Sequence, residues 1–410
     1  MKDGFYIAPI PRARENQNAR AFLNARAAAE ALAFHRSFPA YAPTPLARLS
    51  ALSDKLGLSG VYVKDESFRF GLNAFKVLGA SYAVGRFIAD SLGIPKDELR
   101  FDKLTSPGVL ESLGEVTFVT ATDGNHGRGV AWTARMLHQK AVVYMPEGTA
   151  VERLFNIRAL GAKADILPMS YDACVRYANE QAKKEGWILV QDTAWEGYVQ
   201  IPSLIMQGYL TMALETVRQL GDIIPTHVFL QAGVGSMPGA VAGFLHNYYG
   251  EKSPLVAVVE PNRADCVFLT ARANDGELHH VTGKMDTMMA GLACGTPSPL
   301  AWDVLRETAD YAVSCPDWVS AMGMRLLGNG FGHDPQIISG ESGAVTCGLV
   351  STVMERPDLA HVKDALKLDS HSVVLCFSTE GDTDTENYRA VVQHGKCSSG
   401  AEDTGLYDES

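Results

Sequence analysis

Lys76 stands in a largely apolar stretch of the chain that runs from Ser67 to Ala80, three residues after the polar Asn73. A lysine nitrogen attacks a carbonyl carbon only when it is unprotonated, and a partly desolvated setting lowers the pKa of a lysine enough to give that form near neutral pH. Lys76 is therefore a candidate Schiff-base lysine. Taken alone, however, the stretch favours an ordinary solvated helix lysine.

Two glycine-rich segments each follow a strand-like run and precede a helix-like one. The first spans residues 122–129, and the second spans residues 232–239. Turns of this kind expose backbone N–H groups at the positive end of a helix, where they can hold an anion. A reactive lysine with two anion cradles is what pyridoxal 5'-phosphate chemistry on an amino acid requires, one cradle for the cofactor phosphate and one for the substrate carboxylate.

An ordered set of motifs extends from about Tyr41 to about Gly395. The motifs lie at Asn73–Lys76, Thr122–Gly127, Gln191–Tyr198, Ala232–Gly235, Ser339–Ala344 and Ser378–Asp384. As a set, they resemble the diaminopropionate ammonia-lyases, pyridoxal-phosphate enzymes of the tryptophan synthase β-subunit fold type.

The resemblance implies a fold type II α/β enzyme, built as two three-layer αβα domains with mostly parallel sheets and an active site between them. Residues 1–80 with 206–410 would form the large pyridoxal-phosphate-binding domain, and residues 81–205 a smaller inserted domain. Such a cleft is where open α/β sheets usually bind ligands. The resemblance also implies a homodimer.

It further implies a role for each matching residue. Lys76 would hold the cofactor as an internal aldimine and move the Cα proton, and Asn125 would bond the phenolic oxygen of the cofactor. Ser378 and Thr379 would place a hydroxyl against the pyridine nitrogen. The cofactor phosphate would lie in the loop formed by Gly233, Val234, Gly235, Ser236 and Met237.

Two aspartates make the expected substrate more specific. Related serine and threonine dehydratases carry an uncharged residue in the loop where this chain has Asp123, and a carboxylate there can pair with a second ammonium group. Asp192 would approach from another side, so that the pair serves as acid and base for both enantiomers of diaminopropionate. Either aspartate could instead cap a turn or helix. The substrate would also contact Thr122, Gly124 and His126.

The expected reaction is an α,β-elimination that yields pyruvate and two molecules of ammonia by way of an aminoacrylate. Ammonia leaves only when protonated, so the reaction needs an acid near the β-nitrogen as well as a base at Cα. Three features of the cleft stay open. Trp195 and Tyr198 either close it or are core aromatics, and Glu341 either lies close to the cofactor ring or only shapes a loop.

Alternatives within the same fold are a serine/threonine dehydratase or a cysteine desulfhydrase, against which Asp123 argues. A nicotinamide-dependent dehydrogenase is a further alternative, because Gly233, Gly235 and Gly239 resemble a dinucleotide fingerprint and Glu260 follows about 20 residues on. The glycine spacing is one residue too long, and this reading leaves Lys76 unexplained. A non-catalytic cofactor carrier would not need the paired carboxylates.

Short apolar runs that could position these loops recur along the chain between helix-compatible segments. Unbroken runs of this kind are typical of parallel strands covered on both faces, and they predict an α/β fold. The predicted strands are 60–64, 116–120, 141–145, 164–167, 188–191, 227–231, 255–260 and 372–378.

The composition of the 410 residues, 46% hydrophobic and 20% charged, is that of a globular protein. A net charge of −11 without a basic run argues against a nucleic-acid partner, and leaves a small-molecule amino acid as the expected one. The N-terminal segment does not read as a signal peptide, and glycines and Pro238 interrupt the apolar stretch 228–245. We therefore expect a cytoplasmic enzyme without a membrane partner.

Seven cysteines without a CxxC pair, and the absence of an HExxH sequence, predict no metal site and no disulfide framework. Most of the cysteines are expected to be buried as small apolar residues. Cys266 and Cys294 flank a predicted loop region and could approach each other, but the sequence leaves their pairing open.

Overall fold

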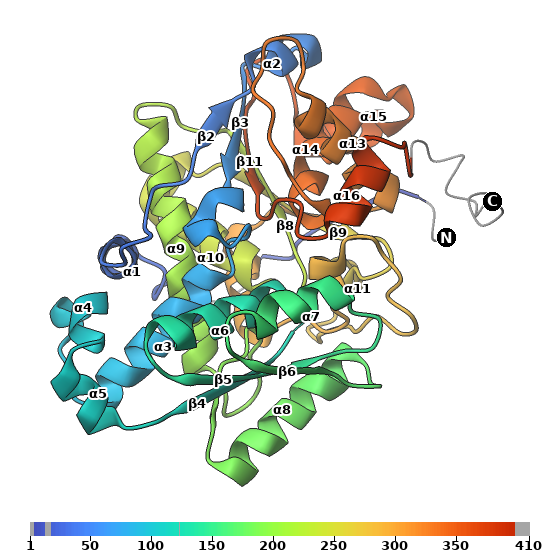
Figure 1. Cartoon of the computed structure of the whole chain (residues 1–410). Coiled ribbons are helices and arrows are strands. Elements are labelled where there is room, and N and C mark those ends of the chain that lie inside the picture. Colours follow the sequence, from blue (N-terminus) through green and yellow to red (C-terminus); the bar gives the residue numbers. More distant parts are fainter. Residues whose placement is uncertain (1–3, 13–17, 123, 398–410) are drawn as a thin grey trace.

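The computed structural model describes residues 4–12, 18–122 and 124–397, and it contains two separate β-sheets (Figure 1). The larger sheet is parallel except for its two edge strands, which pair antiparallel with their neighbours. Its strands in spatial order are β1 (Tyr6–Pro9), β10 (Tyr311–Cys315), β9 (Leu255–Pro261), β8 (His227–Gln231), β11 (Val373–Ser378), β3 (Gly60–Asp65) and β2 (Leu46–Arg48).

The smaller sheet is wholly parallel and comes from the middle of the chain. Its strands in spatial order are β6 (Lys163–Ile166), β5 (Lys140–Met145), β4 (Thr117–Ala121) and β7 (Ile188–Leu189). Strands were observed at all eight predicted positions. The prediction missed β1, β2 and β10.

Helices cover both faces of each sheet, so each sheet is the middle layer of three. One core of the large sheet involves α1 (Ala25–Arg36), α9 (Gln200–Leu220), α10 (Ser236–Tyr249), α11 (Cys266–Ala273) and α12 (Pro299–Thr308). The opposite core involves α2 (Ser50–Leu56), α13 (Asp317–Asn329), α14 (Glu341–Glu355), α15 (Ala360–Leu366) and, through Val391, α16 (Thr385–Val392).

The small sheet has α6 (Asn125–Met136) and α7 (Val151–Arg158) on one face and α8 (Tyr171–Glu185) on the other (Figure 1). Short helices α4 (Phe101–Leu104) and α5 (Pro107–Leu113) precede it. Single 3-10 turns complete the fold at η1 (Glu66–Gly71), η2 (Lys96–Glu98), η3 (Gly250–Lys252), η4 (Ala290–Leu292) and η5 (Pro357–Leu359).

Helix α3 (Val77–Ser91) begins directly after Lys76 and contacts both α9 and α6. It therefore lies between the two halves of the molecule, the large half that contains the seven-stranded sheet and the small half that contains the four-stranded sheet. Glycines allow its neighbours to approach its backbone. A Cβ on Gly129 of α6 would lie 2.9 Å from the Cα of Val77, and one on Gly208 of α9 would lie 2.4 Å from the carbonyl oxygen of Leu78. Any side chain at either position would push the helices apart.

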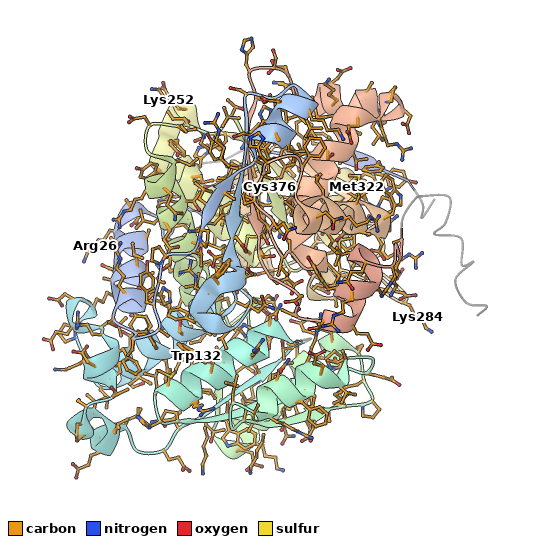
Figure 2. The ribbon with its side chains drawn as sticks, turned by 45° about the horizontal axis from the view of Figure 1, so that its top comes forward. Arg26, Trp132, Lys252, Lys284, Met322 and Cys376 are labelled. Carbon is orange, nitrogen blue, oxygen red and sulfur yellow. The ribbon has the colours of Figure 1, made fainter. Side chains whose placement is uncertain are left out.

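Aromatic side chains add a second junction between the two halves. Trp132 of α6, which is labelled in Figure 2, stacks on Phe38 with ring centroids 5.5 Å apart. It also contacts Phe70 of η1, with ring centroids 5.0 Å apart. All three rings are buried. Such contacts are worth about 0.5–1.5 kcal/mol each beyond the area that they bury.

The apolar stretch 228–245 forms β8, a loop and the start of α10, as predicted. Within the described part of the chain, no helix has the length and apolar character needed to cross a membrane.

Candidate active site

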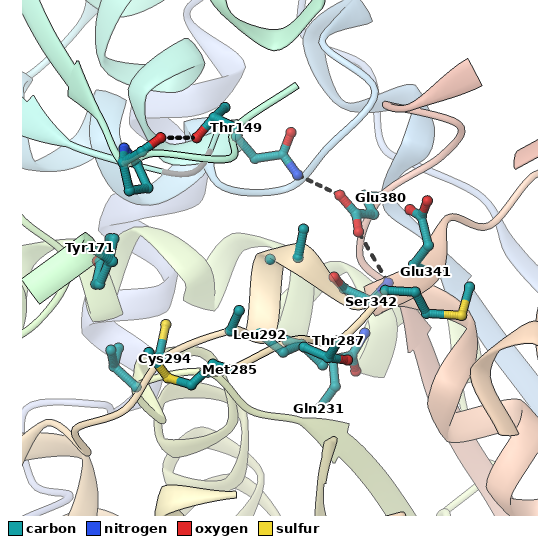
Figure 3. A pocket seen from close by; sticks show the side chains of 18 of the residues that line it. Thr149, Tyr171, Gln231, Met285, Thr287, Leu292, Cys294, Glu341, Ser342 and Glu380 are labelled. Atoms are coloured by element: carbon teal, nitrogen blue, oxygen red, sulfur yellow. Dashed lines mark hydrogen bonds between the residues drawn. The ribbon is translucent and has the colours of Figure 1, made fainter. Parts of the chain in front are cut away.

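A cavity of about 950 Å³ opens between the two sheets, and loops that follow strands of both sheets line it (Figure 3). Gln231 ends β8, Thr379 follows β11, and Asn125 follows β4 by four residues. The carboxyl ends of parallel strands therefore face one space, as the open α/β arrangement predicts. Ligand sites in proteins have volumes of roughly 300–1,000 Å³.

Lys76 and Asp192 meet inside this cavity, although 116 positions separate them in the sequence. The Lys76 Nζ donates a hydrogen bond of 2.7 Å to Asp192 Oδ2. The Lys76 side chain is 20% exposed, whereas that of Asp192 is 5% exposed. Burial alone would raise the pKa of Asp192, but the nearby charges of Lys76 and His126 hold it well below its usual range. Asp192 is therefore a carboxylate at neutral pH.

The surroundings of Lys76 differ from the apolar setting that its neighbours in the sequence predict. Phe75 and Tyr209 do line the cavity beside it, but the nitrogen itself is bound to a carboxylate. Sequence neighbours describe the helix and loop around a residue, whereas the partner of a side-chain tip comes from wherever the fold brings a distant loop. Tyr171 also reaches this carboxylate, donating to Asp192 Oδ1 at 3.4 Å.

The predicted phosphate loop lines the cavity along its whole length, from Gly233 to Met237. Gly235 has φ +95°, a conformation that favours glycine, and the 14-residue helix α10 begins at the next residue. A Cβ on Gly233 would lie 3.1 Å from Cys294 Sγ. The loop thus combines bare backbone with the positive end of a long helix, which suits an anion.

The site residues predicted in the loop after β4 differ in whether they line the cavity. Asn125 lines the cavity, but Thr122, Gly124 and His126 are not among the lining residues. The Thr122 hydroxyl accepts hydrogen bonds from the backbone N–H groups of Gly124 and Gly127 at 2.9 and 3.1 Å, so it shapes the turn. His126 Nε2 lies 2.8 Å from the carbonyl oxygen of Val190. Asp123 lies outside the described residues.

The two hydroxyl residues at the carboxyl end of β11, Ser378 within the strand and Thr379 directly after it, also lie in different surroundings. Thr379 lines the cavity and accepts a hydrogen bond of 2.8 Å from Gln231 Nε2, which leaves its own proton available to a ligand. Ser378 is fully buried, is not among the lining residues, and donates to Ser339 Oγ at 2.8 Å.

Comparison with known proteins relates the chain that forms this cavity to a family. A model of pyridoxal-phosphate dependent enzymes matches residues 38–360. Over 382 residues, the chain is 47% identical to a protein named diaminopropionate ammonia-lyase from Salmonella typhimurium, with 92% of this chain and 95% of the relative covered. The chain belongs to the diaminopropionate ammonia-lyase family. It is an enzyme, and its cofactor is pyridoxal phosphate.

Crystal structures of the Escherichia coli diaminopropionate ammonia-lyase share the fold. One holds D-serine and superimposes with a TM-score of 0.89, and another holds an aminoacrylate-PLP azomethine reaction intermediate and superimposes with a TM-score of 0.87. Each is 44% identical to this chain, with 96% of this chain and 98% of the other covered. The family and the fold type II α/β architecture predicted from the sequence are confirmed.

The geometry of the cavity also fits pyridoxal phosphate, independently of the comparisons. Among the described residues, the buried atoms Gln231 Oε1 and Ser342 Oγ have no hydrogen-bond partner, and both residues line the cavity. Buried polar atoms of this kind usually bind a ligand or water. Together with Lys76 and the glycine loop, they offer an amine, an anion cradle and polar groups for a ring.

Glu380 lines the cavity, although the sequence predicts no role for it. It lies within the motif at 378–384. Its carboxylate accepts a hydrogen bond of 2.5 Å from Asn125 Nδ2 and one of 3.1 Å from the Ser342 backbone (Figure 3). Glu341, which the sequence left open, lies beside it in the cavity. Burial, with the charge of Glu380, raises the pKa of Glu341 to about 7.

Of the other residues left open by the sequence, Trp195, Tyr198 and Cys266 are not among those that line the cavity, whereas Cys294 is. Trp195 and Tyr198 stack on each other at 4.3 Å and pack against the core of the small sheet. Both are partly buried against that core, which favours a packing role over closure of the cleft. Five of the seven cysteines are buried, and Cys266 takes part in no disulfide. Cys266 Sγ donates to the Gly233 carbonyl at 3.6 Å, and Cys294 lines the cavity.

Proposed function

We propose that this enzyme converts 2,3-diaminopropionate to pyruvate and two molecules of ammonia, and that it accepts both enantiomers. The observation that carries the proposal is the Lys76–Asp192 pair inside the cavity, facing a loop suited to phosphate. When bound, pyridoxal phosphate takes up the electron pair released at the substrate Cα. The protein must then bind the substrate, move the Cα proton and protonate the leaving nitrogen.

Lys76 is the residue that we assign to the Cα proton, since its nitrogen lies in the cavity and its helix α3 fixes its position. Asn125 and the loop 233–237 would hold the cofactor, and Thr379 would offer its hydroxyl to the ring. Ser378 is a weaker candidate for that contact, because its hydroxyl donates to Ser339.

Asp192 is the residue that we assign to the second ammonium group of the substrate. A carboxylate that stays ionised at neutral pH attracts a cation and can pass a proton to or from it. We assign the matching role on the other side of the substrate to Asp123. This assignment still rests on its place in the motif at 122–127. Two carboxylates on different sides would let the enzyme use both enantiomers.

Crystal structures of a relative support an elimination. The Escherichia coli relative has been crystallised with an aminoacrylate, the species that β-elimination leaves, and with D-serine, an amino acid of D configuration. This chain covers 98% of that protein at 44% identity. Residues 81–205 include the whole small sheet, which supports their assignment to an inserted domain. We further expect a homodimer, and light scattering of the purified enzyme would test this oligomeric state. We expect the enzyme to act in the cytoplasm.

The test is pyruvate release from each enantiomer of diaminopropionate, with L-serine and L-threonine as comparators. We expect turnover of both enantiomers to exceed that of either comparator. Faster turnover of serine or threonine would indicate a dehydratase and refute the proposal. Lys76→Ala should abolish turnover, and borohydride reduction of the wild-type enzyme followed by peptide mapping should place the label on Lys76. A label on another lysine would refute its role.

A further inference from the structure

Glu380 is anchored within the large half of the molecule. Its backbone pairs with that of Ala74 in an isolated bridge, and the Gly340 N–H donates to the Glu380 carbonyl at 2.9 Å. Neighbouring segments pack closely around the loop that carries Glu380. A Cβ on Gly340 would lie 2.3 Å from the Gly381 carbonyl oxygen, and one on Gly381 would lie 2.0 Å from Asn73 Oδ1. The loop that carries Glu380 therefore has little room to shift.

The carboxylate of Glu380 is almost fully buried, with the residue 2% exposed, and both of its oxygens accept hydrogen bonds. The Ser342 N–H, in the first turn of α14, donates to Oε1 at 3.1 Å. The Thr383 hydroxyl donates to Oε2 at 3.2 Å, and Asn125 Nδ2 donates to the same oxygen at 2.5 Å. Three donors converge on this group, so an acceptor fits here and a donor does not.

Asn125 comes from the other half of the molecule, since it begins α6 beside the small sheet. An ionised carboxylate can only accept, so it selects the nitrogen end of the Asn125 amide. The amide nitrogen carries two hydrogens. One points to Glu380, and the second is left for a ligand of the cavity that Asn125 lines.

We propose that Glu380 is a positioning residue that acts through Asn125, fixing the amide so that its second N–H faces an oxygen atom of the bound cofactor. This inference rests on the proposed role of Asn125 in holding the cofactor. The contact also joins loops of the two halves at the cavity, so cofactor binding and the relative placement of the halves depend on the same hydrogen bond. Glu380 itself is assigned no contact with the reacting atoms.

Glu380→Gln is the informative substitution, because glutamine has the same size. Its carbonyl oxygen can serve one set of donors, but its NH₂ group must then face another. If that group faces Asn125, the Asn125 amide has to turn its own oxygen toward it, and the nitrogen no longer points as before. Glu386→Gln is the matched control, since Glu386 is exposed on the neighbouring helix α16.

The experiment is a double-mutant cycle of Glu380→Gln and Asn125→Ala. The readouts are the dissociation constant of pyridoxal phosphate and the visible absorption spectrum of the loaded enzyme, both measured without substrate. Each single variant should weaken cofactor binding about tenfold, the value expected for one hydrogen bond with a charged partner. In the Asn125→Ala background, Glu380→Gln should add less than about twofold and leave the spectrum unchanged.

Losses that multiply in the double variant would show that Glu380 acts independently of Asn125, and would overturn the proposal. An unchanged dissociation constant for Glu380→Gln would overturn it too. If Glu380→Gln does not fold, Glu380→Asp enters the same cycle, since the shorter side chain keeps the charge but withdraws it from Asn125. Because no substrate is present, the cycle gives its answer even if pyruvate assays refute the proposed reaction.

Discussion

Glu215 of α9 lies at the centre of a buried charge cluster, and its removal is predicted to destabilise the enzyme strongly. Its carboxylate contacts Lys64 Nζ at 2.8 Å and the Arg69 guanidinium at 2.8 and 2.9 Å, while Tyr41 donates to it at 2.8 Å. Lys64 and Arg69 have fully buried side chains, and Glu66 is the other carboxylate bound to Arg69. Glu215→Gln leaves two buried cations with one buried anion.

Two arguments give the size of this effect, one from the pKa of Glu215 and one from buried ion pairs in general. Burial would raise the pKa of Glu215, but hydrogen bonds from Arg69 and the charges of Arg69 and Lys64 lower it from 4.5 to about 2. A shift of that size corresponds to about 3 kcal/mol. Removing one partner of a buried ion pair generally costs about 3–5 kcal/mol. Both values agree on a loss of roughly 3–5 kcal/mol.

Thermal unfolding at pH 7 is the assay. For a chain of 410 residues that unfolds as one unit, the loss corresponds to a fall in Tm of about 3–6 °C. Since the pKa of Glu215 is depressed in the folded state, its contribution is present above pH 4.5 and disappears as the pH falls toward about 2. Glu111→Gln, at an exposed position, is the control and should leave Tm unchanged. A Glu215→Gln variant with the Tm of the control would refute the reasoning.

Three further predictions concern the cavity. Asp192→Asn should retain the cofactor but slow one enantiomer of diaminopropionate at least tenfold more than the other, because the carboxylate lies on one side of Lys76; equal losses in steady-state assays would remove the stereochemical role. Gly233→Val should weaken cofactor binding in equilibrium dialysis, because even a Cβ would lie 3.1 Å from Cys294 Sγ; unchanged affinity would argue against the phosphate loop. Glu341 should titrate near pH 7 in carboxyl NMR, and stability that it contributes below about pH 4.5 should be lost as the pH rises through 7; titration at an ordinary glutamate pKa would contradict its burial beside a charge.

Much of the architecture could be predicted from local patterns, because buried parallel strands leave unbroken apolar runs in the sequence. The three strands that were missed have weaker signals. β2 has three residues and ends in an arginine, β1 contains a proline, and Ser314 interrupts the apolar run of β10. Two of these lie at the edges of the large sheet, where one side of the strand needs no partner.

The site was predicted less completely than the fold. Residue types and turn patterns indicated Lys76 and the glycine-rich loop 233–237, and resemblance to a family added Asn125 and Asp192; all of them line one cavity. The contacts between side chains could not be inferred. Asn125 and Glu380 are 255 positions apart, and their hydrogen bond exists only because two loops from different sheets meet. Periodicity and turn chemistry describe neighbours along the chain, so they carry no information about such a meeting.

The glycine contacts around α3 have a consequence for how the enzyme admits its substrate. Helices α6 and α9 pack closely against the first turn of α3, so the backbone of Lys76, directly before it, has little room to shift. We therefore expect substrate entry to depend on other parts of the cavity wall. The segments 146–150 and 283–288 contribute to that wall and lie between regular elements. Any movement of the Lys76 amine during the reaction must then come from the torsions of its own side chain, because its backbone stays in place.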